Sequence, residues 1–176
     1  MGAIRHTTKR EVLQRAVALL ETSNLKYRHR VFVMTGSDLP PNVNDHDLIT
    51  VSLSGQFSYN EQAAAGQQVV PYQGTLAVSV WHACRTDRQG TDKDALLTED
   101  VGLFDLERDI LRAMLGSLLP GTVSYDPILT QCLYVMNDTE ATRSADGVFG
   151  KTPGGDMAKA VLTVNFGTDF HWDMTA

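Results

Sequence analysis

The sequence predicts an α+β domain: a mixed, mostly antiparallel sheet with two amphipathic helices packed on one face and long polar loops or arms. Two segments, one near the N-terminus and one in the middle of the chain, carry apolar residues at spacings of three and four, as helices do. Other segments alternate apolar and polar residues, as half-buried strands do. The resulting order is helix, strand, strand, strand, helix, strand, strand.

The first helix is predicted over residues 8–22. Thr8 and Glu11 have the spacing of a capping box, and an apolar stripe follows. The stripe consists of Leu13, Ala16, Val17 and Leu20. A β-like run then covers Lys26–Met34 and ends at a turn rich in proline, Thr35–Pro41. The basic residues of Lys26–Arg30 are interpreted as the polar face of an edge strand.

Two further strands are predicted, with a polar arm between them. Leu48–Ser54 alternates strictly, whereas both faces of Thr75–Cys84 are apolar enough for a central strand. The residues between them, 56–73, are polar or rich in alanine and glycine. This composition predicts an extended hairpin arm or a mobile insertion, whose function would be contact with another chain.

The second helix is predicted over residues 99–115, with Thr98 as N-cap and Gly116 ending it. Its buried stripe would be Leu103, Leu106, Ile110 and Met114. The opposite side carries Asp105, Arg108, Asp109 and Arg112, with like charges four residues apart. This side is either a solvated face or a subunit interface.

The last third of the chain predicts two strands and a second arm. Turn signals at Tyr125–Pro127 precede a short strand, Thr130–Met136. A polar stretch with several glycines, 137–156, is the second predicted arm. Ala158–Phe166 closes the fold, and the tail Asp169–Asp173 is interpreted as a terminal anchor, with Trp172 docking on a neighbour or on the domain.

Size and composition predict one domain, 1–176, with a single core. The formal net charge of −6 argues against a surface built to hold nucleic-acid phosphates. Cys84 and Cys132 form no CxxC pair, so we expect free thiols in a reducing compartment. No apolar signal core opens the sequence, and no run of eighteen apolar residues occurs. We therefore expect a protein made and used in the cytosol.

Catalytic and ligand-binding motifs were sought in the sequence. Gly147–Thr152 imitates the end of a phosphate-binding loop, but Ala145 occupies the position of its first glycine and Pro153 disfavours the helix that should follow. His82 and Cys84 are two residues apart in an apolar strand, where core packing is the expected role. We expect no enzyme, no cofactor and no metal site.

The order of elements resembles that of the tail terminator, or tail completion, proteins of long-tailed bacteriophages, which belong to the neck of the virion. Six segments carry the resemblance: the helix 8–22, the strand and turn 26–41, the strand pair 48–84, the connection containing Arg85 and Asp87, the helix containing Asp105–Ile110, and the terminal strands.

The resemblance implies a homohexameric ring that caps the tail tube, stops its polymerisation and joins it to the head connector. Its partners would be copies of itself, the tail tube protein and the head–tail connector protein. DNA would pass through the lumen without sequence-specific binding, and no membrane would be involved. Six copies would carry a formal charge of about −36, which repels DNA if it lines the lumen. The location would be the tail or neck of the virion, after assembly in the host cytoplasm.

Proteins with other functions would show other features. A head–tail connector or tail tube subunit is the nearest alternative. An α+β enzyme would need a cleft with convergent polar groups, and a monomeric binding module would use Trp81 or Trp172 as its hot spot. Under the assembly hypothesis, the candidate contact residues are Tyr59, Gln62, Gln67, Tyr72, Arg85, Asp87, Arg88, Asp105, Arg108, Arg112, Phe149 and Trp172.

Overall fold

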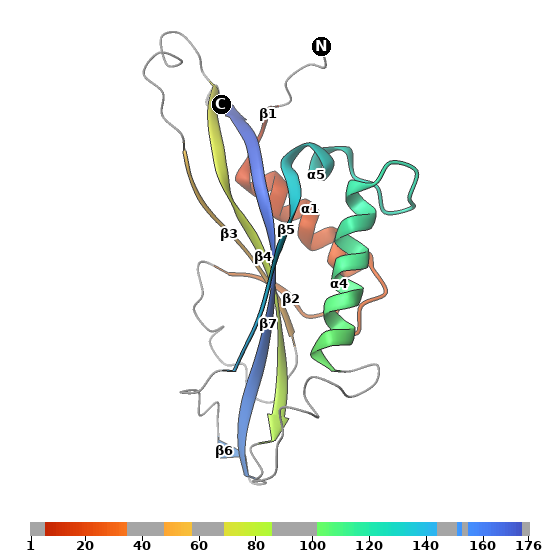
Figure 1. Cartoon of the computed structure of the whole chain (residues 1–176), viewed down its shortest axis with the longest axis vertical. Helices are drawn as coiled ribbons and strands as arrows, with labels where there is room; N and C mark the ends of the chain where they lie inside the picture. Colours follow the sequence, from red (N-terminus) through yellow and green to blue (C-terminus); the bar gives the residue numbers. More distant parts are fainter. Residues whose placement is uncertain are drawn as a thin grey trace.

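The computed structural model of the chain describes residues 6–34, 48–57, 69–85, 102–143, 151–152 and 155–173. In this part of the chain, a long twisted sheet forms one layer and the helices pack on one of its faces (Figure 1). The α+β prediction is confirmed. The strands are β1 (His6–Thr7), β2 (Val31–Val33), β3 (Leu48–Phe57), β4 (Val69–Arg85), β5 (Leu133–Arg143), β6 (Lys151–Thr152) and β7 (Gly155–Asp173); the helices are α1 (Lys9–Thr22), α4 (Leu103–Leu118) and α5 (Pro127–Cys132).

The centre of the sheet is the antiparallel pair β4 and β7, which stay in register from Val69 opposite Asp173 to Arg85 opposite Met157. The strand order is β1-β7-β4-β3-β2, and β5 and β6 also pair with β7. Only the β1–β7 and β2–β3 pairs are parallel among the described strands. One edge of the sheet is therefore β2, and the opposite edge is formed by β1 and β5.

The core lies between the sheet and the helices. Because side chains alternate along a strand, every second residue of β3, β4 and β7 faces the helices. α1 covers the β2–β3 end of the sheet, and α4 covers β4, β7 and β5. The largest fully buried side chains of this layer include Tyr72, Leu76, Phe166, Leu162, Leu20, Leu103, Ile110 and Met114.

The face of the sheet turned away from the helices is mainly small and polar. The hydroxyl oxygens of Ser79 and Thr163 lie 2.8 Å apart across β4 and β7. The indole nitrogen of Trp81 donates a hydrogen bond to Thr50 Oγ1 at 2.9 Å, and Trp81 packs with Leu48 in a small second cluster. Trp81 is therefore a packed and hydrogen-bonded residue rather than an exposed hot spot.

Both predicted arms contain more strand than expected. The ends of the first arm are a hairpin, since β3 continues to Phe57 and β4 begins at Val69; the residues between lie outside the described part. The second arm was predicted from 137 to 156, but β5 continues to Arg143 and β7 begins at Gly155. A bulge between Val135 and Thr139 interrupts the apolar alternation there, while main-chain pairing with β7 continues. The tail Asp169–Asp173 is likewise part of β7 rather than a separate anchor.

The strand predicted over Lys26–Met34 is shorter in the structure. Lys26–His29 form turns, in which Arg28 N donates to Leu25 O and Arg30 N donates to Tyr27 O. Leu25 and Tyr27 are buried and hold these turns against the core. The basic cluster therefore lies in the connection that leads into the edge strand β2 and not in the strand itself.

The two predicted helices exist, with different boundaries. α1 begins after Thr8, whose hydroxyl accepts from Glu11 N at 3.1 Å as predicted. α4 begins at Leu103, with Gly102 as N-cap, and Thr98 lies outside the described residues. Gly116 does not end α4, which runs on to Leu118. A side chain at Gly116 would collide with the Ser124 hydroxyl, so the glycine allows the following loop to pack against the helix.

A third helix, α5, occupies the start of the strand predicted over Thr130–Met136. Asp126 Oδ1 accepts from Ile128 N at 2.8 Å and from Leu129 N at 3.1 Å, and Pro127 occupies the first helical turn. An acceptor followed by proline is a helix start as well as a turn signal. Three buried side chains, Ile128, Leu129 and Cys132, then fix α5 in the core.

We expect the core to carry the stability of the fold. Ile110→Ala removes a fully buried side chain between α4 and the sheet, and should lower the free energy of unfolding by about 2–5 kcal/mol. Leu119→Ala, at an exposed position just beyond α4, should change it by less than about 0.5 kcal/mol. Urea unfolding followed by circular dichroism measures both. Equal losses would contradict this placement of the core.

Candidate assembly surfaces

Three of the predicted contact residues lie on the exposed side of α4. Arg108 Nη1 lies 2.9 Å from Asp105 Oδ1, and Arg108 Nε lies 3.2 Å from Asp109 Oδ1. These pairs relieve the repulsion expected between the two aspartates. Exposed ion pairs contribute about 0–1 kcal/mol, so this face is not needed for folding and is available for contact. Arg112 is exposed and lines a polar groove of about 330 Å³ with Asp109 and Asn24.

Tyr72 is not a surface contact, and its prediction as one is wrong. The side chain is fully buried, because the two-residue period of β4 places it on the core face with Leu76 and Val78. Its ring lies 4.8 Å from that of Phe170, and Lys9 Nζ lies 4.5 Å from the ring centre. Burial raises the pKa of the Tyr72 hydroxyl. Tyr72 is thus part of the packing under α1.

The remaining predicted contacts are placed only in part. Arg85 and Trp172 lie at the ends of the central strands, opposite Met157 and Val70 respectively, and their side chains are not among those described. The other six lie outside the described residues: Tyr59, Gln62, Gln67, Asp87, Arg88 and Phe149. Their roles stay predictions.

Exposed large apolar side chains of the described residues lie on several elements. On the β2 edge, Phe32 and Val33 are 47% and 54% exposed. The other exposed side chains belong to the first turn of α4, the α4–α5 loop and β5, and they are Phe104, Leu119, Val123, Tyr125 and Tyr134. The sequence pattern did not single these residues out, because it assigned them to strands, turns or a helix stripe.

A groove of about 570 Å³ lies beside β2, between this edge strand and α1. Its apolar part is formed by Leu13, Val17 and Val33. α1 buries Val12, Ala16 and Leu20 against the sheet, whereas Leu13 and Val17 lie on the flank and are only partly covered. The apolar stripe of α1 is therefore wider than the surface that the sheet offers it. The groove is completed by Lys9, Arg10, Gln14, Ala18 and Glu21.

The α4–α5 loop, residues 119–126, has a defined conformation. Thr122 Oγ1 donates to the carbonyl oxygens of Gly116 and Leu119, and Asp126 N donates to Ser117 O at 2.9 Å. Gly121 has φ +90°, a conformation that favours glycine. Val123, next to these contacts, is fully exposed. The loop therefore holds an aliphatic side chain in solvent on a hydrogen-bonded support that carries no charge from Leu119 to Tyr125.

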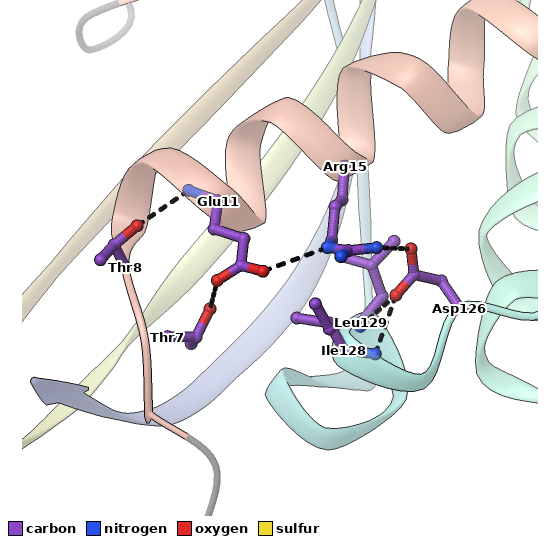
Figure 2. A network of polar contacts seen from close by, with 7 residues as sticks. All are labelled: Thr7, Thr8, Glu11, Arg15, Asp126, Ile128 and Leu129. Atoms are coloured by element: carbon purple, nitrogen blue, oxygen red, sulfur yellow. Dashed lines mark hydrogen bonds and ion pairs between the residues drawn. The ribbon is translucent and has the colours of Figure 1, made fainter.

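A polar network joins α1 to α5 (Figure 2). Thr7 Oγ1 donates to Glu11 at 2.8 Å, Glu11 lies 3.5 Å from Arg15 Nε, and Arg15 Nη1 lies 2.8 Å from Asp126 Oδ2. The other oxygen of Asp126 caps α5. The hydrogen bond to Asp126 raises the pKa of Arg15. This network fixes α1, which lines the groove, relative to α5, which follows the α4–α5 loop.

The described part of the chain contains no cluster of three or more His, Cys, Asp or Glu side chains suited to a metal ion. None of its helices has the length and apolar composition needed to cross a membrane. Cys132 is buried, whereas the side chains of His82 and Cys84 are not among those described.

No protein-family model matches the sequence, and comparison with curated proteins finds no significant match. What the chain does is therefore inferred from its own surfaces.

Asp126 should make stability depend on pH. Burial raises the pKa of this carboxyl, but the hydrogen bonds from Leu129 N, Arg15 and Ile128 N outweigh burial and lower it. A lowered folded-state pKa gives stability that is complete above the unfolded value of about 3.9 and is lost as pH falls through the folded value. Asp126→Asn keeps a helix cap and loses the ion pair, so we expect a loss of about 0.5–1 kcal/mol at pH 7.

Unfolding of both proteins in urea between pH 7 and pH 3 measures this effect. The difference between them should shrink below about pH 4. Asp169→Asn, at an exposed position of β7, is the matched control and should leave stability unchanged. A difference between wild type and Asp126→Asn that stays constant with pH would contradict the role of the ion pair.

Proposed function

We propose that the chain is a structural virion protein that assembles head-to-tail into a homohexameric ring, the tail terminator of a long-tailed bacteriophage. The ring caps the tail tube, stops its polymerisation and joins it to the head connector. Its partners are copies of the same chain, the tube protein and the connector protein, and its place is the tail or neck of the virion.

One observation carries the proposal: the described chain exposes large apolar side chains on two different elements, the edge strand β2 and the α4–α5 loop. The first surface consists of Phe32, Val33 and the α1–β2 groove, and the second is centred on the α4–α5 loop. Subunits of a cyclic ring contact one another through two unlike, complementary surfaces, one given to each neighbour. Exposed apolar side chains that form a contiguous surface are typical of interaction sites.

The element order and the charge of the chain support the more specific part of the proposal. The helix, strand and hairpin order resembles that of tail terminators, and the α+β architecture is compatible with it. If the negative charge of a chain with net charge −6 lines the lumen of the ring, its summed field repels DNA. Such a ring lets DNA pass without retaining it.

The proposal predicts reversible association in solution. Light scattering should give a mass that rises with concentration from 19.3 kDa toward about 116 kDa, six times that value. Because the surfaces are apolar, the association should survive 0.5 M salt, which screens exposed ion pairs. Electron micrographs at the highest concentration should show closed rings.

Two other results would count against the proposal. Long tubes in the micrographs would instead identify a tail tube subunit. A constant mass of 19.3 kDa at every concentration and salt would remove the support for a ring.

A further inference from the structure

We infer that the connection between α1 and β2, together with Phe32 of the edge strand, binds single-stranded nucleic acid. The cations of this connection, here called the basic turns, are Lys26, Arg28 and Arg30. They hold phosphates of the strand, and the ring of Phe32 stacks on a base. The inference goes beyond the proposed function and does not depend on the formation of a ring.

The basic turns carry positive charge that the described protein does not neutralise. Elsewhere, Arg15 and Arg108 each pair with two carboxylates. Within the described part of the chain, no carboxylate forms an ion pair with Lys26, Arg28 or Arg30. At physiological salt, charges more than about 8 Å away are largely screened, so these local cations outweigh the net charge of −6 for an anion at the turns.

The backbone of the basic turns is fixed before any ligand arrives. Arg28 N donates to Leu25 O at 3.3 Å, and Arg30 N donates to Tyr27 O at 2.9 Å. Leu25 and Tyr27 are buried in the core. Ile49 N donates to Arg30 O at 3.0 Å, which joins the end of the turns to β3. Cations on a fixed backbone lose less conformational entropy on binding than cations on a free loop.

Arg30 and Phe32 lie on the face of the sheet that the helices leave uncovered. Main-chain pairing with β3 extends from Arg30 to Met34, and Phe32 lies opposite Thr50. Thr50 accepts the Trp81 hydrogen bond on the uncovered face, so Phe32 points to that face, and the two-residue period gives Arg30 the same direction. Phe32 is exposed. A cation and an exposed aromatic ring therefore share one side of the edge strand.

Val33 points to the other side of β2, where it lines the groove with α1. A neighbouring chain seated in that groove would leave Arg30 and Phe32 accessible on the opposite face. The nucleic-acid site is thus compatible with the proposed assembly.

The chemistry of the patch favours a single strand over other anionic partners. Proteins that bind single strands combine cations along the backbone with aromatic rings that stack on bases, and arginine binds phosphate through two parallel hydrogen bonds. In a duplex the bases are already stacked on one another, so none is offered to Phe32. An acidic peptide offers carboxylates to the cations but no flat base to the ring.

Fluorescence anisotropy with a labelled oligothymidylate tests the inference. The full chain should bind the single strand in 50 mM salt. If three cations contact phosphates, the affinity should fall with a log–log slope of about −2 against salt, which is about 20-fold between 50 and 200 mM.

Two variants separate the roles of charge and stacking. Arg28→Gln should weaken binding and make the slope shallower by about 0.7, because one phosphate contact is lost. Phe32→Ala should weaken binding at least about 5-fold and leave the slope unchanged, because stacking releases no ions.

The matched controls are Arg10→Gln, which removes an exposed cation from the far end of α1, and Val33→Ala, which shortens an exposed side chain on the other side of β2. Both should bind the single strand like wild type. Circular dichroism of all four variants should match wild type, which shows that the fold is kept.

Four results would overturn the inference. The first is a wild-type chain that does not bind the oligothymidylate in 50 mM salt. The second is unchanged binding by Arg28→Gln, since the strand would then lie elsewhere on the surface. The third is displacement by polyglutamate with no effect of Phe32→Ala, which would identify an acidic protein as the partner. The fourth is tighter binding of a duplex than of the single strand, which would exclude stacking on Phe32.

Discussion

The antiparallel pairing of β4 with β7 is the constraint on which the rest of the structure depends. The two strands stay in register over the whole length of β4, so main-chain hydrogen bonds hold them together from Val69 to Arg85. Once this register is fixed, every side chain of both strands is assigned to one face, since a slip of one residue would exchange the faces. The apolar face then requires a cover, and α1 and α4 supply it. The opposite face, with Thr50, Ser79 and Thr163, satisfies part of its polar groups within itself.

The sequence predicted the parts of the fold that have a clear period. The α1 cap, the alternation of β3 and the buried stripe of α4 were all predicted correctly, since each depends on local spacing. The start of α5 was missed because Asp126–Pro127 is equally a turn signal, and only the burial of Ile128 and Leu129 decides between them. The length of β5 was missed because a bulge hides the alternation, and main-chain pairing leaves no mark in the sequence. Tyr72 was misassigned because its polar surroundings in the sequence outweighed its register in β4.

The exposed apolar residues were harder to predict than the fold, for a physical reason. Leu13 and Val17 have the spacing of core residues, and only the width of the sheet beneath α1 leaves them partly uncovered. Val123 lies in a turn, and a single valine there forms no repeating apolar pattern that the sequence could reveal. The exposed charged face of α4 was predicted correctly, but its ion pairs contribute little to stability. Periodicity identifies what a chain buries within itself, whereas a surface left for a neighbour becomes visible only when the domain is assembled.

Under the proposed self-association, an acidic chain must overcome its own charge. Six copies at −6 each would repel one another, and at physiological salt this repulsion is screened beyond about 8 Å. Only charges close to a contact would then matter. Burial of apolar side chains is little affected by salt, so exposed residues such as Val33 and Val123 would supply attraction under conditions in which ion pairs are weak.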